Sequence, residues 1–234
     1  MKLAQKEIEE WIKPFATIVG EEIEVDDKLK DENSLRYFLK KTIPNRFESY
    51  AVALHSFWIN KTIPTENIRE SKDEDEDLPE DDFDRVKWNN YYAHKGKPFE
   101  LKNLFKSSTQ FYKQFNQMNN ELFPGEGLMD KEHLNSLVEI VLDKYGDQDI
   151  EVFYTFLATS DWEKDRIYSG KIAGLNKLLG NEELRLTPSL IYPKDKKWVV
   201  NTDYDLPFSF VGGDKELISE LVLQNNNEIY EIKY

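Results

Sequence analysis

The chain has 234 residues, a length that fits one large domain or two small ones and allows a substantial core. Its 45 acidic and 31 basic residues give a formal net charge of −14, which disfavours binding to nucleic-acid phosphates and to anionic membranes. The absence of cysteine excludes disulfides, thiolate metal sites and cysteine nucleophiles.

The N-terminus lacks the apolar run of a signal peptide, and no uncharged apolar stretch approaches the roughly 18 residues of a membrane span. We therefore expect a cytoplasmic protein that does not associate with membranes. The hydrophobic fraction is a modest 39%, but 5 Trp, 12 Tyr and 14 Phe can each remove a large area from water. These aromatic residues predict a folded chain with an aromatic-rich core.

The N-terminal segment predicts a helix followed by a hairpin. Apolar residues from Leu3 to Phe15 recur at helical spacing, and the helix is expected to end near Pro14. Residues 17–25 then alternate in the manner of a short hairpin, with Gly20 in the turn.

A second helix and a buried strand follow. Asn33 or Ser34 is placed to cap the helix, which must stop near Ile43 because Pro44 follows. Residues 50–59 are apolar on both alternating faces, a pattern typical of a strand that is covered on two sides.

Residues from about 66 to 84 form the one low-complexity segment, centred on five consecutive acidic residues, 73–77. Clustered like charges with few apolar residues predict a mobile acidic loop. Carboxylates at Asp73, Asp75, Asp77 and Asp84 match the spacing of a calcium loop, but Leu78 stands where that loop requires Gly. We therefore expect a solvated loop and neither a bound metal nor a cofactor.

The middle of the chain predicts two helices. Apolar residues at threes and fours from Leu101 to Met118 predict the first, which ends before Pro124. Asp130 is the expected cap of the second, and Gly146 is expected to end it in the left-handed conformation.

The last third alternates short strands with helices. Helical segments are expected over 172–179 and after Asp214. Strands are expected at 150–158, 189–192, 198–202, 208–211 and 228–234. Because this order is not a regular βαβ alternation, we predict an α+β fold with a mixed or mainly antiparallel sheet flanked by helices, in a single domain spanning residues 1–234.

Three segments carry a resemblance to known proteins: residues 43–55, 86–88 and 189–221. The first contains Pro44, Phe47, Tyr50 and His55, the second ends at Trp88, and the third contains Pro193, Asp195, Trp198, Asp203, Asp205 and Val211-Gly212-Gly213. Their order and spacing resemble a family of uncharacterised bacterial proteins. Its members have an early Pro-x-Gly-Phe-x-x-Tyr…His-Pro block and a late Trp-Trp-Pro…Asp-Arg-x-Trp…Val-Gly-Gly block.

The resemblance covers about half of the chain and includes two departures. Ser56 follows the histidine where the family has Pro, and Ile191-Tyr192 replaces the Trp pair. The resemblance implies one folding unit, since its blocks flank the acidic loop and the central helices. It implies no reaction and transfers no catalytic residue.

Three polar residues are the weak catalytic candidates. Asp203 and Asp205 follow a strand two residues apart, so an extended backbone would place both carboxylates on one face for acid–base or metal chemistry. Acidic residues at strand ends also cap turns, and Pro207 follows closely. His55 lies within an apolar strand, where a hydrogen-bonded core histidine is the usual outcome, whereas His133 is expected to be solvated in the first turn of its helix.

Four tryptophans, Trp58, Trp88, Trp162 and Trp198, are the candidate binding residues because Trp is favoured at binding surfaces. They form either an aromatic groove or separate parts of the core.

Two functions remain open. The favoured hypothesis is a non-enzymatic cytosolic interaction protein whose acidic surface masks a basic protein partner, by analogy with proteins that neutralise bacterial toxins. The alternative is a small-molecule-binding protein or hydrolase that uses Asp203, Asp205 and the aromatic groove. A broad acidic face would favour the first hypothesis, and a deep aromatic pocket with inward carboxylates would favour the second.

Overall fold

A computed structural model of the chain describes residues 1–16, 34–72, 82–101, 115–224 and 228–234. Its main feature is an eight-stranded sheet in which every pairing is antiparallel. In spatial order the strands are β1 (Lys2–Leu3), β7 (Arg166–Lys171), β6 (Asp149–Tyr154), β8 (Leu190–Pro193), β9 (Val199–Thr202), β10 (Phe208–Gly213), β2 (Ser49–Leu54) and β11 (Ile229–Ile232). The predicted α+β class is confirmed.

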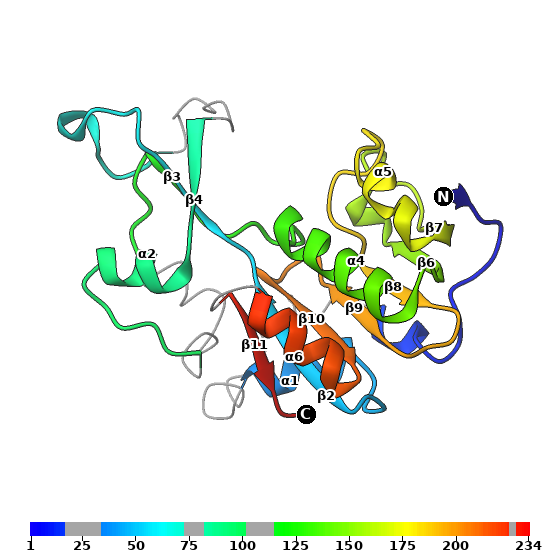
Figure 1. Cartoon of the computed structure of the whole chain (residues 1–234). Coiled ribbons are helices and arrows are strands. Elements are labelled where there is room, and N and C mark those ends of the chain that lie inside the picture. The colour runs from blue at the N-terminus through cyan, green and yellow to red at the C-terminus, as the bar shows by residue number, and fades with distance from the viewer. Residues whose placement is uncertain (17–33, 73–81, 102–114, 225–227) are drawn as a thin grey trace.

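Helices cover both faces of the large sheet (Figure 1). One face packs against α4 (Lys131–Tyr145), α6 (Lys215–Gln224) and the short α5 (Leu175–Leu179), and the other packs against α1 (Ser34–Thr42). Alternate residues of β2 therefore enter different clusters, with Val52 in one and Ala53 in the other. Burial on both faces explains why the central strands are almost continuously apolar.

A second, three-stranded antiparallel sheet lies beside the first (Figure 1). It consists of β4 (Phe83–Val86), β3 (Phe57–Asn60) and β5 (Glu121–Leu122), and α2 (Trp88–His94) packs against it through aromatic rings. The rings of Phe57 and Tyr91 stack with centroids 3.7 Å apart. Both belong to the same hydrophobic cluster as Val52 and Phe210 of the large sheet, so one apolar core runs from sheet to sheet.

The remaining regular elements are single 3₁₀ turns. They are η1 (Lys13–Phe15), η4 (Thr65–Asn67), η7 (Phe156–Ala158) and η8 (Ile172–Gly174). Within the described residues, no helix combines the length and the apolar content needed to cross a bilayer.

Several predicted elements are confirmed. The helices at α1, α4 and α6 and the strands at β6, β8, β9, β10 and β11 match the expected bounds to within four residues. Gly146 ends α4 as predicted, with a φ of 75° and a ψ of −171°, a positive-φ backbone that favours glycine but differs from the left-handed helical cap expected there.

The single strand predicted over 50–59 is wrong, because the chain leaves the large sheet at His55 and enters the small one at Phe57. Backbone hydrogen bonds mark the change: the His55 N–H donates to Pro207 O, and the Ser56 N–H donates to an Asp130 carboxylate oxygen. Both partners are distant in sequence, so no local pattern indicates the break.

The predicted N-terminal helix is also wrong. Lys2–Leu3 pairs with β7 as an edge strand, and Lys6 pairs with the buried Glu151, so the segment lies along the sheet with only the turn η1 near its end. The predicted hairpin at 17–25 lies outside the described residues.

The flanks of the acidic segment are ordered in places where we expected a loop. Glu70 forms a bridge with Met118, while Phe83 and Asp84 begin β4, and Asp84 lies 2.6 Å from the Lys61 ammonium. The run 73–77 lies outside the described residues. So does most of the helix predicted from Leu101, and its last part is not helical, since residues 115–120 contain a bridge and a turn.

Replacement of Trp198 by Ala should lower the free energy of unfolding by roughly 3–5 kcal/mol. The ring is fully buried and packs with Val200 on the α4 face, while its Nε1 donates to Gln148 Oε1 at 3.0 Å. Urea unfolding measures the loss. Trp198→Phe, which keeps most of the apolar area, should lose less, and an Ala variant with the wild-type midpoint would contradict this account of the core.

Candidate functional site

Asp203 and Asp205 do not form an extended pair, because the chain turns directly after β9. The Asp203 carboxylate is 5% exposed and accepts a hydrogen bond from the backbone N–H of Asp205 at 2.9 Å. This contact closes the turn. A cavity of about 10 Å³ adjoins Asp203, which is enough for one water molecule.

The four candidate tryptophans lie in different parts of the molecule. Trp88 and Trp198 are fully buried in two separate hydrophobic clusters, and Trp58 is half-buried in β3. Trp162 differs from these three because 53% of its surface is exposed. An aromatic groove built from all four therefore does not form.

His55 is fully buried and hydrogen-bonded through both ring nitrogens, as the sequence led us to expect. Nδ1 lies 2.6 Å from Gly125 O, a carbonyl that can only accept, so Nδ1 carries the proton and Nε2 accepts from Ser209 Oγ at 2.9 Å. Burial lowers the pKa of His55 to about 4, so the ring is neutral at pH 7.

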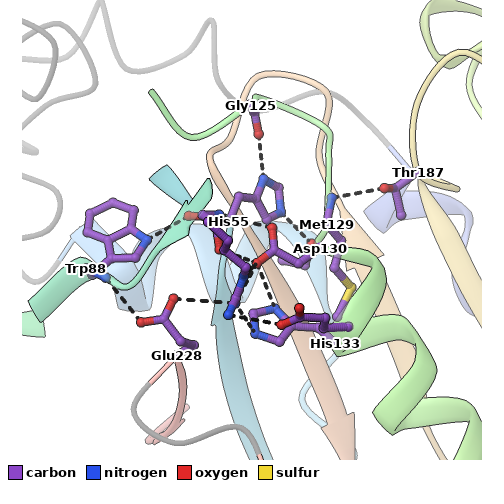
Figure 2. A network of polar contacts seen from close by, with 12 residues as sticks. His55, Trp88, Gly125, Met129, Asp130, His133, Thr187 and Glu228 are labelled. Atoms are coloured by element: carbon purple, nitrogen blue, oxygen red, sulfur yellow. Dashed lines mark hydrogen bonds and ion pairs between the residues drawn. The ribbon is translucent and has the colours of Figure 1, made fainter. Parts of the chain in front are cut away.

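A network of buried polar and charged groups surrounds the crossing between the sheets (Figure 2). We call it the junction network, and its members are His55, Ser56, Arg85, Asp130, His133 and Glu228. They come from the β2–β3 connection, from β4, from the start of α4 and from the residue before β11. Four segments that are distant in sequence therefore meet at one point.

Asp130 is the centre of the junction network. Its Oδ1 accepts the Ser56 N–H at 3.0 Å, and its Oδ2 accepts the Ser56 hydroxyl and the Arg85 guanidinium, with Nε at 2.9 Å and Nη2 at 2.7 Å. Burial opposes ionisation of this carboxyl, but His133, Ser56 and Arg85 together hold its pKa below the usual range. Asp130 does precede α4 as predicted, yet its side chain makes no cap hydrogen bond with the helix.

His133 is buried, contrary to its predicted solvation. It is 1% exposed, and its Nε2 lies 3.3 Å from Arg85 Nη2. Burial lowers its pKa to about 4. The prediction failed because the first turn of α4 faces Arg85, which belongs to a strand that the sequence analysis did not find.

Glu228 joins α2 to the same network. Its Oε1 accepts the Trp88 backbone N–H at 3.2 Å, its Oε2 lies 3.6 Å from Arg85 Nη2, and its backbone O accepts the Leu54 N–H. The Trp88 indole in turn donates to His55 O at 2.6 Å. These groups are buried and bonded to one another, so their geometry suits joining the two sheets.

An exposed loop forms the second notable site. We call residues 155–165, which connect β6 to β7, the Trp162 loop. Trp162 has a φ of 55°, a left-handed conformation that is uncommon for a bulky residue, and the Glu163 N–H bonds back to Asp161 Oδ1 at 3.2 Å. The guanidinium carbon of Arg185 lies 5.4 Å from the Trp162 ring centroid.

Further contacts fix the conformation of the Trp162 loop. The Phe156 N–H donates to Asp165 Oδ1 at 2.8 Å, and Arg166 pairs with both Asp161 and Glu183. The Ser160 N–H donates to Glu183 O at 3.0 Å, which attaches the loop to the chain before β8. Phe156, at the start of the loop, is 42% exposed.

Searches against protein-family models, curated proteins and solved structures found no match. Among the described residues, no group of three or more His, Cys, Asp or Glu side chains is placed to hold a metal ion.

Sequence reasoning missed Arg85, Asp130 as an ion-pair partner, and Glu228. Arg85 offered little signal, because Phe83-Asp84-Arg85-Val86 does not alternate apolar and polar residues as a half-buried strand does. Glu228 offered none, since its role depends on a contact with Trp88, 140 positions away.

Removal of the Asp130 carboxylate should destabilise the protein by about 3–5 kcal/mol, because Asp130→Ala leaves the Arg85 charge buried without its closest partner. Glu132 provides a matched control: it pairs with the same guanidinium at 3.1 Å, but its side chain is 68% exposed. Glu132→Ala should cost less than about 1 kcal/mol. Chemical denaturation of both variants gives the comparison, and equal losses would contradict the assigned role of Asp130.

Proposed function

We propose that the chain is a non-enzymatic interaction protein that binds a basic protein partner through a surface centred on Trp162. The observation that carries this proposal is the rigidly held Trp162 loop, which presents a largely exposed indole ring to solvent. The partner would be met in the cytoplasm, the compartment that suits a chain without cysteine.

Energetics favour Trp162 as the centre of such a surface. A Trp that becomes buried on binding removes a large apolar area from water and is among the residues that most often dominate interface energies. The hydrogen bonds within the loop fix the backbone in advance, so less conformational entropy is lost on binding.

Backbone strain at Trp162 supports the same interpretation. A non-glycine residue with positive φ costs on the order of 1–3 kcal/mol and persists only where the surroundings enforce it. Such residues cluster at binding and active sites. Here the strained residue carries a largely exposed apolar ring, whereas packing of a core would bury that ring.

Charges around the ring indicate the kind of partner. The exposed carboxylates of the surrounding segments belong to Asp161, Glu163, Asp165, Glu182 and Glu183. Lys164, Arg166 and Arg185 are the nearby bases; Arg166 is paired with two of these carboxylates, and Arg185 lies over the Trp162 ring. An apolar centre with a negative rim complements a basic surface that carries an apolar contact point.

The test combines affinity capture with binding measurements on purified variants. Tagged wild-type protein is incubated with a native lysate of the source cells at low and high salt, and the captured protein is identified and purified. We expect a basic partner whose capture weakens at high salt because exposed charges are screened. Trp162→Ala should weaken its binding at least tenfold, the loss that a central interface tryptophan implies.

Leu223→Ala is the matched control, since Leu223 is 77% exposed on α6 and should not affect binding. Trp162→Ala should leave the urea midpoint nearly unchanged, which separates lost binding from lost folding. A partner that binds Trp162→Ala as tightly as wild type would contradict the proposed surface, and captured proteins without excess positive charge would contradict the proposed partner.

A further inference from the structure

Two buried carboxylates share one guanidinium in the junction network. The side chains of Asp130 and Glu228 are 7% and 1% exposed, and Arg85 is the base that faces both. Two ionised carboxylates beside a single positive charge leave one negative charge uncompensated in a region of low dielectric constant. One of the two acids should therefore retain its proton more strongly than an ordinary carboxyl group.

Hydrogen bonds decide which acid this is. Asp130 accepts from the Ser56 N–H, the Ser56 hydroxyl and two nitrogens of Arg85. Glu228 accepts only the Trp88 N–H at Oε1, and its Oε2 accepts no hydrogen bond from the described residues. Arg85 is also closer to Asp130, at 2.7 Å compared with 3.6 Å to Glu228. The charge is thus better stabilised on Asp130.

We propose that Glu228 is a buried proton-binding site, protonated when the two sheets are firmly joined, and that its ionisation weakens the junction between them. This inference is independent of the proposed partner. Glu228 links several parts of the junction, because its carboxyl group accepts the N–H of the first residue of α2, its backbone O accepts the N–H at the end of β2, and it directly precedes β11.

The other charged groups facing Glu228 shift its pKa in both directions. Arg85 from β4 and Lys87 before α2 favour its ionisation, whereas Asp130 opposes it. Tyr230 of β11 also interacts with the carboxyl group, and His133 of α4 faces the same guanidinium. Burial outweighs these effects and raises the pKa of Glu228 to about 7 from an ordinary value of 4.5.

The direction of the pH effect follows from the raised pKa. The folded chain keeps this proton to a higher pH than the unfolded chain does, so the stabilisation is complete below about 4.5 and is lost as pH rises through about 7. His55 and His133 act in the opposite sense at lower pH, since their lowered pKa values remove stability as pH falls from 6.5 toward 4. A comparison with a Glu228 variant isolates the Glu228 contribution.

The decisive experiment is an NMR titration of the side-chain carboxyl carbons in wild-type protein between pH 4 and pH 9. We expect the Glu228 signal to titrate near pH 7, and the Trp88 amide signal to move with the same midpoint. Titration of Glu228 together with the surface glutamates would overturn the proposal. This measurement needs no variant and so does not depend on whether a substitution folds.

Urea unfolding of Glu228→Gln tests the weakening of the junction. Between pH 5 and pH 8 the unfolding equilibrium constant of wild type should rise relative to that of this variant by about a hundredfold. Glu139→Gln, at an exposed position of α4, is the matched control and should show no such trend. A wild-type to Glu228→Gln ratio that does not change with pH would overturn the proposal.

Discussion

The fold depends on one buried ion pair, between Asp130 and Arg85, at the point where the chain passes from the large sheet to the small one. The crossing at His55 and Ser56 takes two residues out of the strand ladders, so their backbone N–H groups need other acceptors in the interior. Asp130 supplies one acceptor and Pro207 O supplies the other. The same carboxylate also binds Arg85 of β4. One side chain therefore supplies an acceptor for the backbone at the crossing and attaches the small sheet to it.

Local patterns predicted most of the large sheet but missed its strands β1 and β7, and they predicted the small sheet poorly. Residues 198–202 and 208–211 are short, apolar and bounded by turns, and α4 has a clear apolar stripe, so each could be found without knowledge of its neighbours. Residues 50–59 resemble one strand because both segments are apolar, although β2 is buried throughout and β3 is half-buried at Trp58 and Ile59. The break at His55 and Ser56 depends on hydrogen-bond partners more than 70 positions away, which a local sequence pattern does not contain.

The same distinction applies to the sites. His55 is hydrogen-bonded in the core, as expected. An apolar strand buries the ring, and a buried ring nitrogen without a hydrogen bond would be unfavourable. Burial of His133 was not expected, since it depends on a contact with Arg85. Trp162 was a candidate only as one of four tryptophans in a groove or a core, and the structure instead exposes it alone, on a loop with a positive φ and side-chain contacts from Asp161 and Asp165. Aromatic composition predicts a core, and only the backbone geometry distinguishes the ring that points outward.

Native-state hydrogen exchange in low urea tests the central claim, that the junction network makes the two sheets open as one unit. If the claim is correct, the amides of β3 and β4 in wild-type protein exchange with the same opening free energy as those of β2 and β10. In Asp130→Asn the small sheet should then open separately and at lower free energy. Separate opening of the small sheet in wild-type protein would contradict the account.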